Sequence, residues 1–311
     1  MSALLLPAKR AVRASFGASA STYDAHAFLQ REIANRLFER LQYIKLEPAR
    51  VLDIGSGTGY ATQKLRERYP TATLLALDIA PDMLFAARNK AAHSKATIKS
   101  IIKRLFGKRH DREYLCGDAE SLPLARESID LAVSNLALQW TDPERVAKEA
   151  VRVLKPQGLF MFTTFGPDTL KELRAAFKAV DDAPHVNSFV DMHDIGDILV
   201  HAGFADPVMD QEIVTLTYAE LKPLLRELKG IGAHNVLPGR ATGLTGKHRW
   251  QRMVEAYEQF RVDGRLPATY EVVYGHAWKP EFSKRKAVDG EQQIDLAEFK
   301  RMLHKSRVAF L

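Results

Sequence analysis

An acidic residue and three alternating glycines form the most informative motif of this chain: Asp53, Gly55, Gly57 and Gly59. The apolar residues around Asp53 predict a strand, and residues 60–69 predict a helix after the glycines. Glycines at such a turn allow backbone conformations that other residues avoid, and they let a ligand approach the main chain. The pattern differs from the Gly-x-Gly-x-x-Gly of dinucleotide sites, which must accommodate a pyrophosphate. Asp53 instead suits a cationic amino group such as that of S-adenosylmethionine, although the loop alone also fits an ordinary strand–turn–helix corner.

Polar residues also stand at the ends of the second, third and fourth predicted strands: Asp78, Asp118 and Asn135. In a doubly wound sheet, ligands bind beyond the carboxyl ends of the strands. Asp78 is placed to accept both hydroxyls of a ribose, which NAD would also offer, and Asp118 is placed to accept the exocyclic amine of an adenine. Asn135 falls beside the site of methyl transfer. Each side chain alone could cap a helix or turn, but four strand ends in register favour S-adenosylmethionine.

Strands and helices alternate along the chain, which is the pattern of a parallel sheet covered on both faces. The predicted strands are residues 51–54, 73–77, 114–116, 130–134, 159–164, 208–216 and 270–278. The predicted helices include 26–43, 58–68, one from Pro81, 143–154 and 193–203, and residues 155–158 predict a turn. The fold class is therefore α/β: a doubly wound, seven-stranded, mostly parallel, Rossmann-like sheet, with an N-terminal helical lid and a helical cap inserted before the last strand.

These elements divide the chain into five parts. We expect lid helices in residues 1–44, the S-adenosylmethionine-binding core in 45–217, a helical substrate cap in 218–265, the last core strand in 266–279 and a charged tail in 280–311. The first 22 residues are basic and poor in acids, as in a transit peptide, but their apolar run is too short for a secretory signal. We interpret them as part of the fold and expect a cytoplasmic protein.

The amino-acid composition limits the kinds of partner that this protein can bind. No apolar run approaches the roughly 20 residues of a membrane span, so we expect a globular protein without a membrane contact. The single cysteine, Cys116, excludes an intramolecular disulfide and a multi-cysteine metal site, and its strand context predicts a buried structural thiol. Residues 91–112 carry +6 of the net charge of +7, so the rest of the chain offers no basic surface for nucleic acid. This insertion is either a solvated segment or a docking site for an acidic partner.

The sequence indicates the acceptor of the methyl group less directly than it indicates the methyl donor. Residues 134–140, Ser-Asn-Leu-Ala-Leu-Gln-Trp, lack the Asn/Asp-Pro-Pro-aromatic turn common in enzymes that methylate base amines. No Cys–His, Ser–His–Asp or metal-ligand spacing stands out, so we expect no metal and assign no catalytic acid or base. Methyl transfer from a sulfonium to a carboxylate tolerates that absence, because the nucleophile is already charged and needs positioning and desolvation.

From about Val12 to Trp278 the chain resembles the malonyl-acyl carrier protein O-methyltransferases of biotin synthesis, within the class I S-adenosylmethionine-dependent methyltransferases. The more specific motifs are Phe16-Gly-Ala-Ser-Ala-Ser-Thr-Tyr23 with Asp24-Ala-His26 and Leu29-Gln-Arg31, residues 134–140, Ala179-Val-Asp-Asp-Ala-Pro-His185 with Asn187 and Phe189, and Leu228-Lys-Gly-Ile-Gly-Ala233. The resemblance implies that the free carboxyl of malonyl on acyl carrier protein becomes a methyl ester, which primes pimeloyl synthesis for biotin. It also implies cofactor contacts from Asp53, Gly55, Gly57, Gly59, Asp78, Ile79, Met83, Asp118, Ala119 and Asn135.

Acceptor-side roles follow from the same resemblance. Tyr23 would close over the methyl donor, Gln139 and Trp140 would wall the malonyl pocket, and His185, Arg226 or Lys229 would meet the carboxylate; each also fits a packing or surface role. The basic insertion and the tail depart from the family pattern, and we hypothesise that the insertion contacts the acidic carrier. Three alternatives stay open: a methyltransferase of small acids of the trans-aconitate type, an arginine hydroxylase like the mitochondrial complex I assembly factor, and a module that binds the cofactor without turnover.

Overall fold

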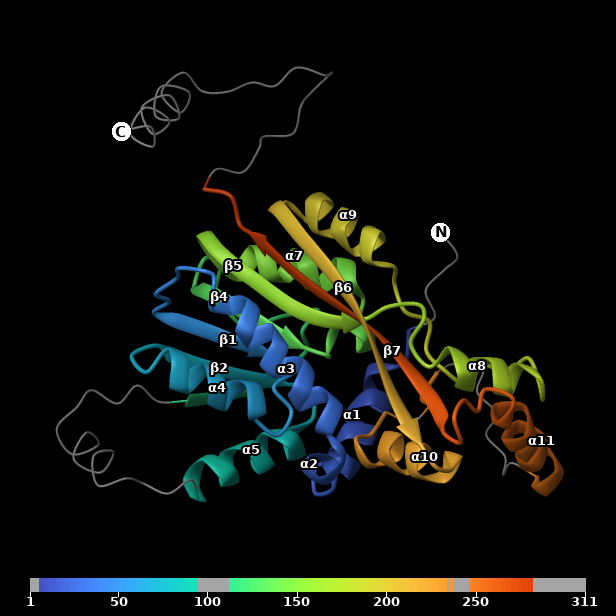
Figure 1. The fold of residues 1–311 in the computed structure, drawn as a ribbon. Helices are drawn as coiled ribbons and strands as arrows, with labels where there is room; N and C mark the ends of the chain where they lie inside the picture. Colours follow the sequence, from blue (N-terminus) through green and yellow to red (C-terminus); the bar gives the residue numbers. More distant parts are fainter. Residues whose placement is uncertain (1–5, 94–111, 234, 238–245, 282–311) are drawn as a thin grey trace, which may run out of the picture.

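A seven-stranded sheet forms the centre of the molecule (Figure 1), in a computed structural model that describes residues 6–93, 112–233, 235–237 and 246–281. The order across the sheet is β3-β2-β1-β4-β5-β7-β6. The strands are β1 (Arg50–Ile54), β2 (Thr73–Asp78), β3 (Arg112–Cys116), β4 (Ile129–Asn135), β5 (Leu154–Phe165), β6 (Ala205–Tyr218) and β7 (Leu266–Trp278). The first five are parallel, and β7 runs antiparallel to both β5 and β6. The predicted fold class is confirmed.

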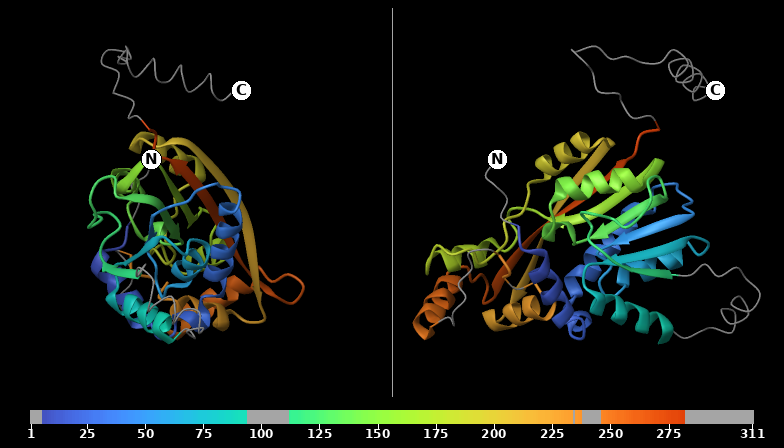
Figure 2. Two further views of the ribbon diagram at one scale, coloured as in Figure 1. Left: turned by 90° about the vertical axis from the view of Figure 1, so that its left-hand side faces the viewer. Right: turned by 180° about the vertical axis from the view of Figure 1, so that it is seen from behind.

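Helices cover both faces of this sheet (Figure 2). They are α1 (Lys9–Ser19), α2 (Tyr23–His26), α3 (Phe28–Leu41), α4 (Tyr60–Arg68), α5 (Pro81–His93), α7 (Pro143–Val153), α8 (Lys171–Lys178), α9 (Met192–Ala202), α10 (Leu221–Gly230) and α11 (Lys247–Glu258). Successive strand residues point to opposite faces. Val51 of β1 therefore joins the core shared with α3 and α4, while Leu52 joins the core shared with α7 and α9.

The cap is larger than the sequence indicates. Helices α10 and α11 lie between β6 and β7, as expected, but α8 was not predicted and packs against α11. Its buried Leu173 and Ala176 lie on one face of the helix and join the core beneath the cap. Figure 1 shows α8, α10 and α11 gathered at one end of the long strands β6 and β7.

Three local predictions need correction. The predicted turn at residues 155–158 lies inside β5 as a bulge, because Lys279 closes it by backbone hydrogen bonds with Gln157 and Gly158 (both 2.8 Å). The predicted helix 26–43 is divided at Ala27 into α2 and α3. Cys116 is exposed instead of buried, because β3 is the edge strand of the sheet.

Some expectations fall outside the described residues. Most of the basic insertion 91–112 and nearly all of the tail 280–311 belong to this part of the chain. Within the described ranges, no helix has both the length and the apolar character needed to cross a membrane. The described side chains also contain no group of three or more His, Cys, Asp or Glu suited to a metal ion.

Candidate active site

The glycine loop joins β1 to α4 and requires its glycines. All three have positive φ angles, +71° at Gly55, +53° at Gly57 and +86° at Gly59. A Cβ atom at Gly55 would lie 2.3 Å from the Cβ of Ala137. The backbone N–H of Gly55 donates to the carbonyl of Leu77 (2.8 Å), which holds the loop against β2. The loop therefore presents bare main chain to the space beyond the strand ends.

Asp78 stands at the end of β2 and connects that strand to the loop. Its carboxylate accepts hydrogen bonds from the backbone N–H groups of Gly57 and Ala80 (both 2.8 Å). The side chain is buried, and this burial raises its pKa. Two backbone donors fix the carboxylate while leaving lone pairs for a ligand hydroxyl. This geometry suits the ribose role predicted for Asp78.

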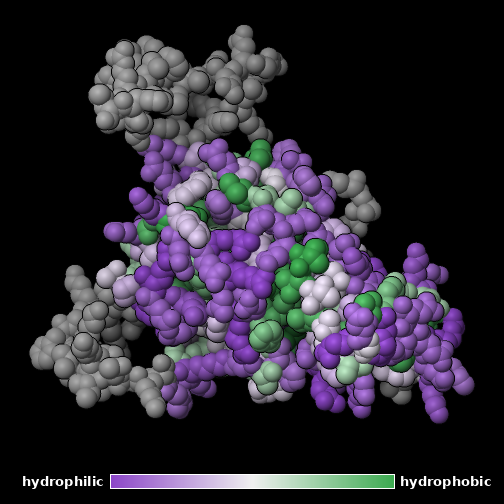
Figure 3. All heavy atoms as spheres, in the orientation of Figure 1, coloured by the Kyte–Doolittle hydropathy of each residue, from purple (hydrophilic) through white to green (hydrophobic). Residues whose placement is uncertain are grey.

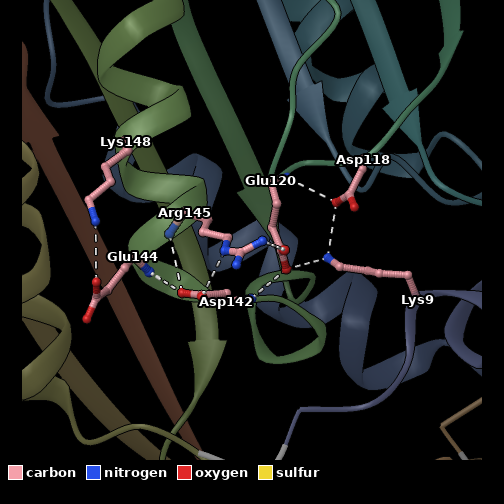
Figure 4. A network of polar contacts seen from close by, with 7 residues as sticks. All are labelled: Lys9, Asp118, Glu120, Asp142, Glu144, Arg145 and Lys148. Carbon is pink, nitrogen blue, oxygen red and sulfur yellow. Dashed lines mark hydrogen bonds and ion pairs between the residues drawn. The ribbon is translucent and has the colours of Figure 1, made fainter.

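Asp118 follows the end of β3 and is in contact with the N-terminal lid (Figure 4). Lys9 of α1 donates to Asp118 Oδ1 (3.0 Å) and also pairs with Glu120. Glu120 in turn accepts a hydrogen bond from the backbone N–H of Asp142 (2.7 Å), the residue that caps α7. Lys9 thus connects α1 of the lid to the segment that follows β3.

These residues surround a cavity of about 740 Å³ that is partly open to solvent. We call it the cofactor cavity; it is lined by Lys9, Val12, Phe16, Tyr23, Ile54, Gly55, Gly57, Leu77, Asp78, Ile79, Met83, Gly117, Asp118, Ala119, Ser134 to Leu138, Trp140, Thr141 and Val146. Nearly all of the predicted cofactor residues are among them. Asp53 and Gly59 are the exceptions.

Asp53 lines a smaller neighbouring cavity beside the glycine loop, together with Gly55, Gly57 and Asn135. Its carboxylate is buried and accepts a hydrogen bond from the hydroxyl of Thr62. Burial raises the pKa of Asp53 to about 7, despite the Thr62 hydrogen bond and with a further contribution from the charge of Asp78. A cationic ligand group at this place would stabilise the ionised carboxylate.

The same small cavity contains two polar atoms that the sequence did not single out. Gln30 Oε1 and Ser56 Oγ are buried and have no hydrogen-bond partner among the described residues. Buried polar atoms in native proteins are normally paired, so an unpaired one indicates a missing ligand or water. The motif Leu29-Gln-Arg31 contained the signal for Gln30, but only the fold brings this helix to the glycine loop.

A second, larger cavity of about 1030 Å³, also partly open to solvent, lies under the cap. We call it the acceptor cavity; its lining is mainly aromatic and aliphatic, and consists of Phe16, Tyr23, His26, Phe28, Leu29, Gln30, Leu136, Gln139, Trp140, Phe165, Thr169, Leu170, Leu173, His185, Val186, Asn187, Phe189, Leu216, Glu227, Leu228, Ile231, Ala233, Asn235 and Tyr270. The described lining contains no lysine or arginine.

The two cavities share four wall residues: Phe16, Tyr23, Leu136 and Trp140. Phe16 and Trp140 pack edge to face, with ring centroids 5.2 Å apart. Burial, with the charges of Asp78 and Asp24, raises the pKa of the Tyr23 hydroxyl, which therefore remains a donor. A group bound in one cavity can meet a group bound in the other at this junction.

Known proteins resemble this chain over most of its length. Residues 52–162 match a family described as a methyltransferase domain. A malonyl-[acyl-carrier protein] O-methyltransferase from Laribacter hongkongensis is 53% identical over 92% of this chain and 94% of its own length. The protein of the same name from Gallionella capsiferriformans is 54% identical over 88% and 91%. This chain belongs to the malonyl-[acyl-carrier protein] O-methyltransferase family.

Solved structures support the fold of this malonyl-[acyl-carrier protein] O-methyltransferase family member. The YcgJ protein from Bacillus subtilis superposes with a TM-score of 0.55 at 17% identity, covering 79% of this chain and 98% of its own. A putative methyltransferase from Bacillus halodurans gives 0.52 at 20% identity, with the same coverage. At these identities the likeness concerns the architecture alone.

Acceptor-side residues predicted from the sequence divide into two groups in this member of the family. Tyr23, Gln139, Trp140 and His185 line the acceptor cavity, whereas Arg226 and Lys229 lie on the exposed face of α10 and are absent from its lining. The amide nitrogen of Gln139 already donates to the carbonyl of Leu136 (2.7 Å). The assignment of roles to these side chains stays a prediction.

His185 is held in place by its neighbours. Its ring stacks on the ring of Phe177, with the two centroids 3.9 Å apart, and its Nε2 lies 2.8 Å from Asp181 Oδ1. Although burial acts to raise the pKa of Asp181, hydrogen bonds from His185 and Arg249 lower it to about 2. This ionised carboxylate fixes the orientation of the His185 ring at the wall of the acceptor cavity.

The lid is bound to the glycine loop and to the cap as well as to Asp118. Thr58 donates to Asp24 Oδ1 (2.7 Å), and Lys90 of α5 pairs with the same carboxylate. On the other side, Ser15 donates to the carbonyl of Gly232 (2.6 Å), and Thr22 donates to that of Gly230 (2.9 Å). These two pairs of contacts keep the lid between the glycine loop and the cap, above the carboxyl ends of the strands.

Proposed function

We propose that this protein transfers a methyl group from S-adenosylmethionine to the free carboxyl of malonyl carried on acyl carrier protein. The observation that carries the proposal is the junction of the two cavities at Phe16, Tyr23, Leu136 and Trp140. The family to which the chain belongs supports this choice of acceptor. The ester would prime pimeloyl synthesis for biotin, and the proposed location is the cytoplasm.

The residues around the glycine loop fit S-adenosylmethionine, which supplies an electrophilic methyl group on sulfonium. Asp78 would accept the ribose hydroxyls, and Asp118 would accept the adenine amine. Asp53 and the unpaired Gln30 Oε1 offer acceptors for the ammonium group of the amino-acid end. Gln30 Oε1 supports this fit independently of the sequence motif, because it is a buried polar atom that lacks a partner among the described residues.

The acceptor cavity suits a nucleophile that is already charged. A carboxylate oxygen forms the new bond to the methyl carbon, while the carbon–sulfur bond breaks and its electron pair stays on sulfur. No proton has to be removed, so the reaction needs alignment and exclusion of water. The aromatic walls Phe16 and Trp140 exclude water, and no lysine or arginine in the described lining quenches the negative charge.

Tyr23 is the residue that we propose to orient the carboxylate. It lines both large cavities and the small one, so its side chain borders the junction where methyl and carboxylate would meet, and its hydroxyl keeps its proton. A neutral donor can hold one carboxylate oxygen while the other remains free to react. Gln139, Trp140 and His185 would complete the wall.

The decisive experiment incubates the protein with S-adenosylmethionine and malonyl-acyl carrier protein and measures the intact mass of the carrier. We expect the mass increment of one methyl group. Acetyl-acyl carrier protein is the matched control, because it lacks the free carboxyl and should gain no mass. An unchanged malonyl carrier, with cofactor bound to the protein, would overturn the proposal.

A further inference from the structure

The outer face of α10 carries a row of three cations, Lys222, Arg226 and Lys229, all exposed to solvent. Their spacing of four and then three residues places them on one side of the helix, over about 10 Å. None of them forms an ion pair or a side-chain hydrogen bond with a described residue. We call this row the α10 stripe.

Several other cations in the cap, the lid and the neighbouring α5 are engaged within the protein, whereas Arg10 and Arg13 of α1 are exposed and isolated along the lid. Arg249 of α11 pairs with Asp181, and Arg252 donates to the carbonyl of Ala179 (2.8 Å). Lys9 and Lys90 likewise pair with acids of the core and the lid. These four side chains connect different elements of the fold, whereas the side chains of the α10 stripe form no ion pair or hydrogen bond with any described residue. The α10 stripe is therefore available to an external partner.

The inner face of the same helix belongs to the acceptor cavity. Glu227 and Leu228 line that cavity, and Glu227 accepts a hydrogen bond from the hydroxyl of Tyr218 (2.6 Å). Helix α10 packs against α2, as Figure 1 shows, and α3 begins directly after α2 at Phe28. Phe28 lines the cavity and is 64% exposed, so it marks the cavity mouth. Helix α10 thus forms part of the wall of the acceptor cavity near its mouth, and the α10 stripe lies on the outer side of this helix.

We propose that the α10 stripe is the docking surface for the acyl carrier protein, a partner that rests on the proposed function. Acyl carrier proteins are acidic, so their charge complements the three cations. Around α10 and α11 the surface is mainly hydrophilic (Figure 3), as expected for an interface that forms and separates in every turnover. A carrier bound there can deliver its acyl arm past Phe28 into the acceptor cavity.

Arg226 and Lys229 have a different role on this docking surface from the one expected from the sequence. Arg226 and Lys229 were predicted to meet the malonyl carboxylate inside the pocket, but their side chains lie on the opposite side of the α10 wall. On the docking surface they meet carboxylates of the carrier instead. The two roles predict different kinetics, because only the docking role depends on the carrier protein.

The test compares Lys222→Glu/Arg226→Glu with a control, Lys45→Glu/Arg126→Glu, which makes the same change in net charge. Lys45 and Arg126 are exposed and precede β1 and β4, at the sheet edge opposite the site. At low salt we expect the KM for malonyl-acyl carrier protein to rise about tenfold or more in the α10 variant, with less dependence on ionic strength. With the carrier-free thioester malonyl-N-acetylcysteamine, both variants should retain the wild-type kcat/KM.

Each other result has a definite meaning. An unchanged KM for the carrier substrate, or an equal rise in the control variant, overturns the docking proposal. An equal loss with both substrates also overturns it and assigns the cations to the acyl carboxylate. Wild-type protein that does not methylate malonyl-acyl carrier protein at all refutes the proposed function, and the docking proposal with it. An unchanged melting temperature and cofactor affinity would show that the variants are folded.

Discussion

The cofactor cavity and the acceptor cavity meet at four residues but are built in opposite ways. The cofactor cavity is formed mainly by the ends of β1 to β4, with α1 of the lid beside them, and its acidic groups, Asp78 and Asp118, lie next to the ends of β2 and β3. The acceptor cavity is formed by helices and loops from the lid, from α8 and from α10, and its described lining is mainly aromatic and aliphatic.

This difference has a physical reason. A cofactor with a fixed set of donors is recognised by acceptors at fixed places, which a parallel sheet provides at the ends of its strands. A carboxylate that must react needs a water-poor site with few strong partners, which packed aromatic side chains provide. Variants in the two cavities should therefore separate cofactor affinity from turnover of the acceptor, and the following predictions test this separation.

The largest effect is expected from Gly55→Ala in the glycine loop. The new Cβ would contact Ala137 at 2.3 Å, on a backbone with a φ of +71°. We expect the free energy of unfolding to fall by about 3 kcal/mol or more and cofactor binding to be lost. Gly203→Ala is the control, because its φ is +103° but no atom lies within 4 Å. Equal losses in chemical denaturation would show that strain alone, without the clash, determines the effect.

The next largest effect is expected from Asp78→Asn, which removes the charge and keeps only one of the two oxygens that accept from the backbone N–H groups of Gly57 and Ala80. We expect affinity for S-adenosylmethionine, measured by calorimetry, to fall about 100-fold, which corresponds to about 3 kcal/mol. Asp130→Asn is the matched control, because Asp130 accepts from the backbone of Ala49 and Arg50 at the opposite sheet edge. Retained affinity in Asp78→Asn would remove the ribose role from this residue.

Asp53 makes cofactor affinity depend on pH. Because its pKa is raised to about 7, an ammonium ligand that favours the carboxylate should bind about tenfold more tightly at pH 8 than at pH 6. The stability of the cofactor-free protein has the opposite sign: it falls as pH rises from about 4 to about 7, because the unfolded carboxyl loses its proton first. Asp53→Asn should abolish the pH dependence of affinity, and a persistent slope in that variant would point to another group.

Tyr23→Phe tests the junction between the cavities. We expect the KM for malonyl-acyl carrier protein to rise about fivefold, because one hydrogen bond of about 1 kcal/mol is lost. Cofactor affinity should change by less than about twofold. If cofactor affinity falls instead and the KM for the carrier does not change, the hydroxyl belongs to the cofactor cavity.

The smallest effect is expected from Lys9→Met in the lid. Its ion pairs with Asp118 and Glu120 are partly exposed, so their loss should weaken cofactor affinity by about two- to fivefold. Lys148→Met is the control, since among the described residues Lys148 pairs with Glu144 alone, on the surface of α7 (Figure 4). A faster release of the cofactor in Lys9→Met, measured by stopped-flow, would show that α1 retains it.

The strand-end part of the cofactor cavity could be predicted because it is local in sequence. Strand, turn and helix around Asp53 and Gly59 are adjacent in the chain, and the parallel sheet then brings Asp78 and Asp118 to the same edge. Gln30 and Ser56 were missed, because an unpaired buried oxygen is a property of packing and not of residue type.

The acceptor side required the fold. Helix α8 carries an amphipathic pattern that was missed in the sequence, but its place under the cap follows from packing against α11 and β7. The spacing of Lys222, Arg226 and Lys229 is written in the sequence, but the face of α10 on which they lie is decided by the burial of Leu221 and Leu224. The same holds for Cys116, whose exposure depends on β3 being an edge strand.

The sequence by itself determined the α/β fold class, the glycine loop and the acids that follow the strands, because these depend on backbone conformation and on periodic burial. Only the tertiary structure decided which side chains share a cavity, where the lid meets the cap and which cations point outward. Those relations join residues such as Lys9 and Asp118, or Ser15 and Gly232, that lie more than one hundred positions apart. Contacts over such separations arise from the packing of whole elements, which no local pattern encodes.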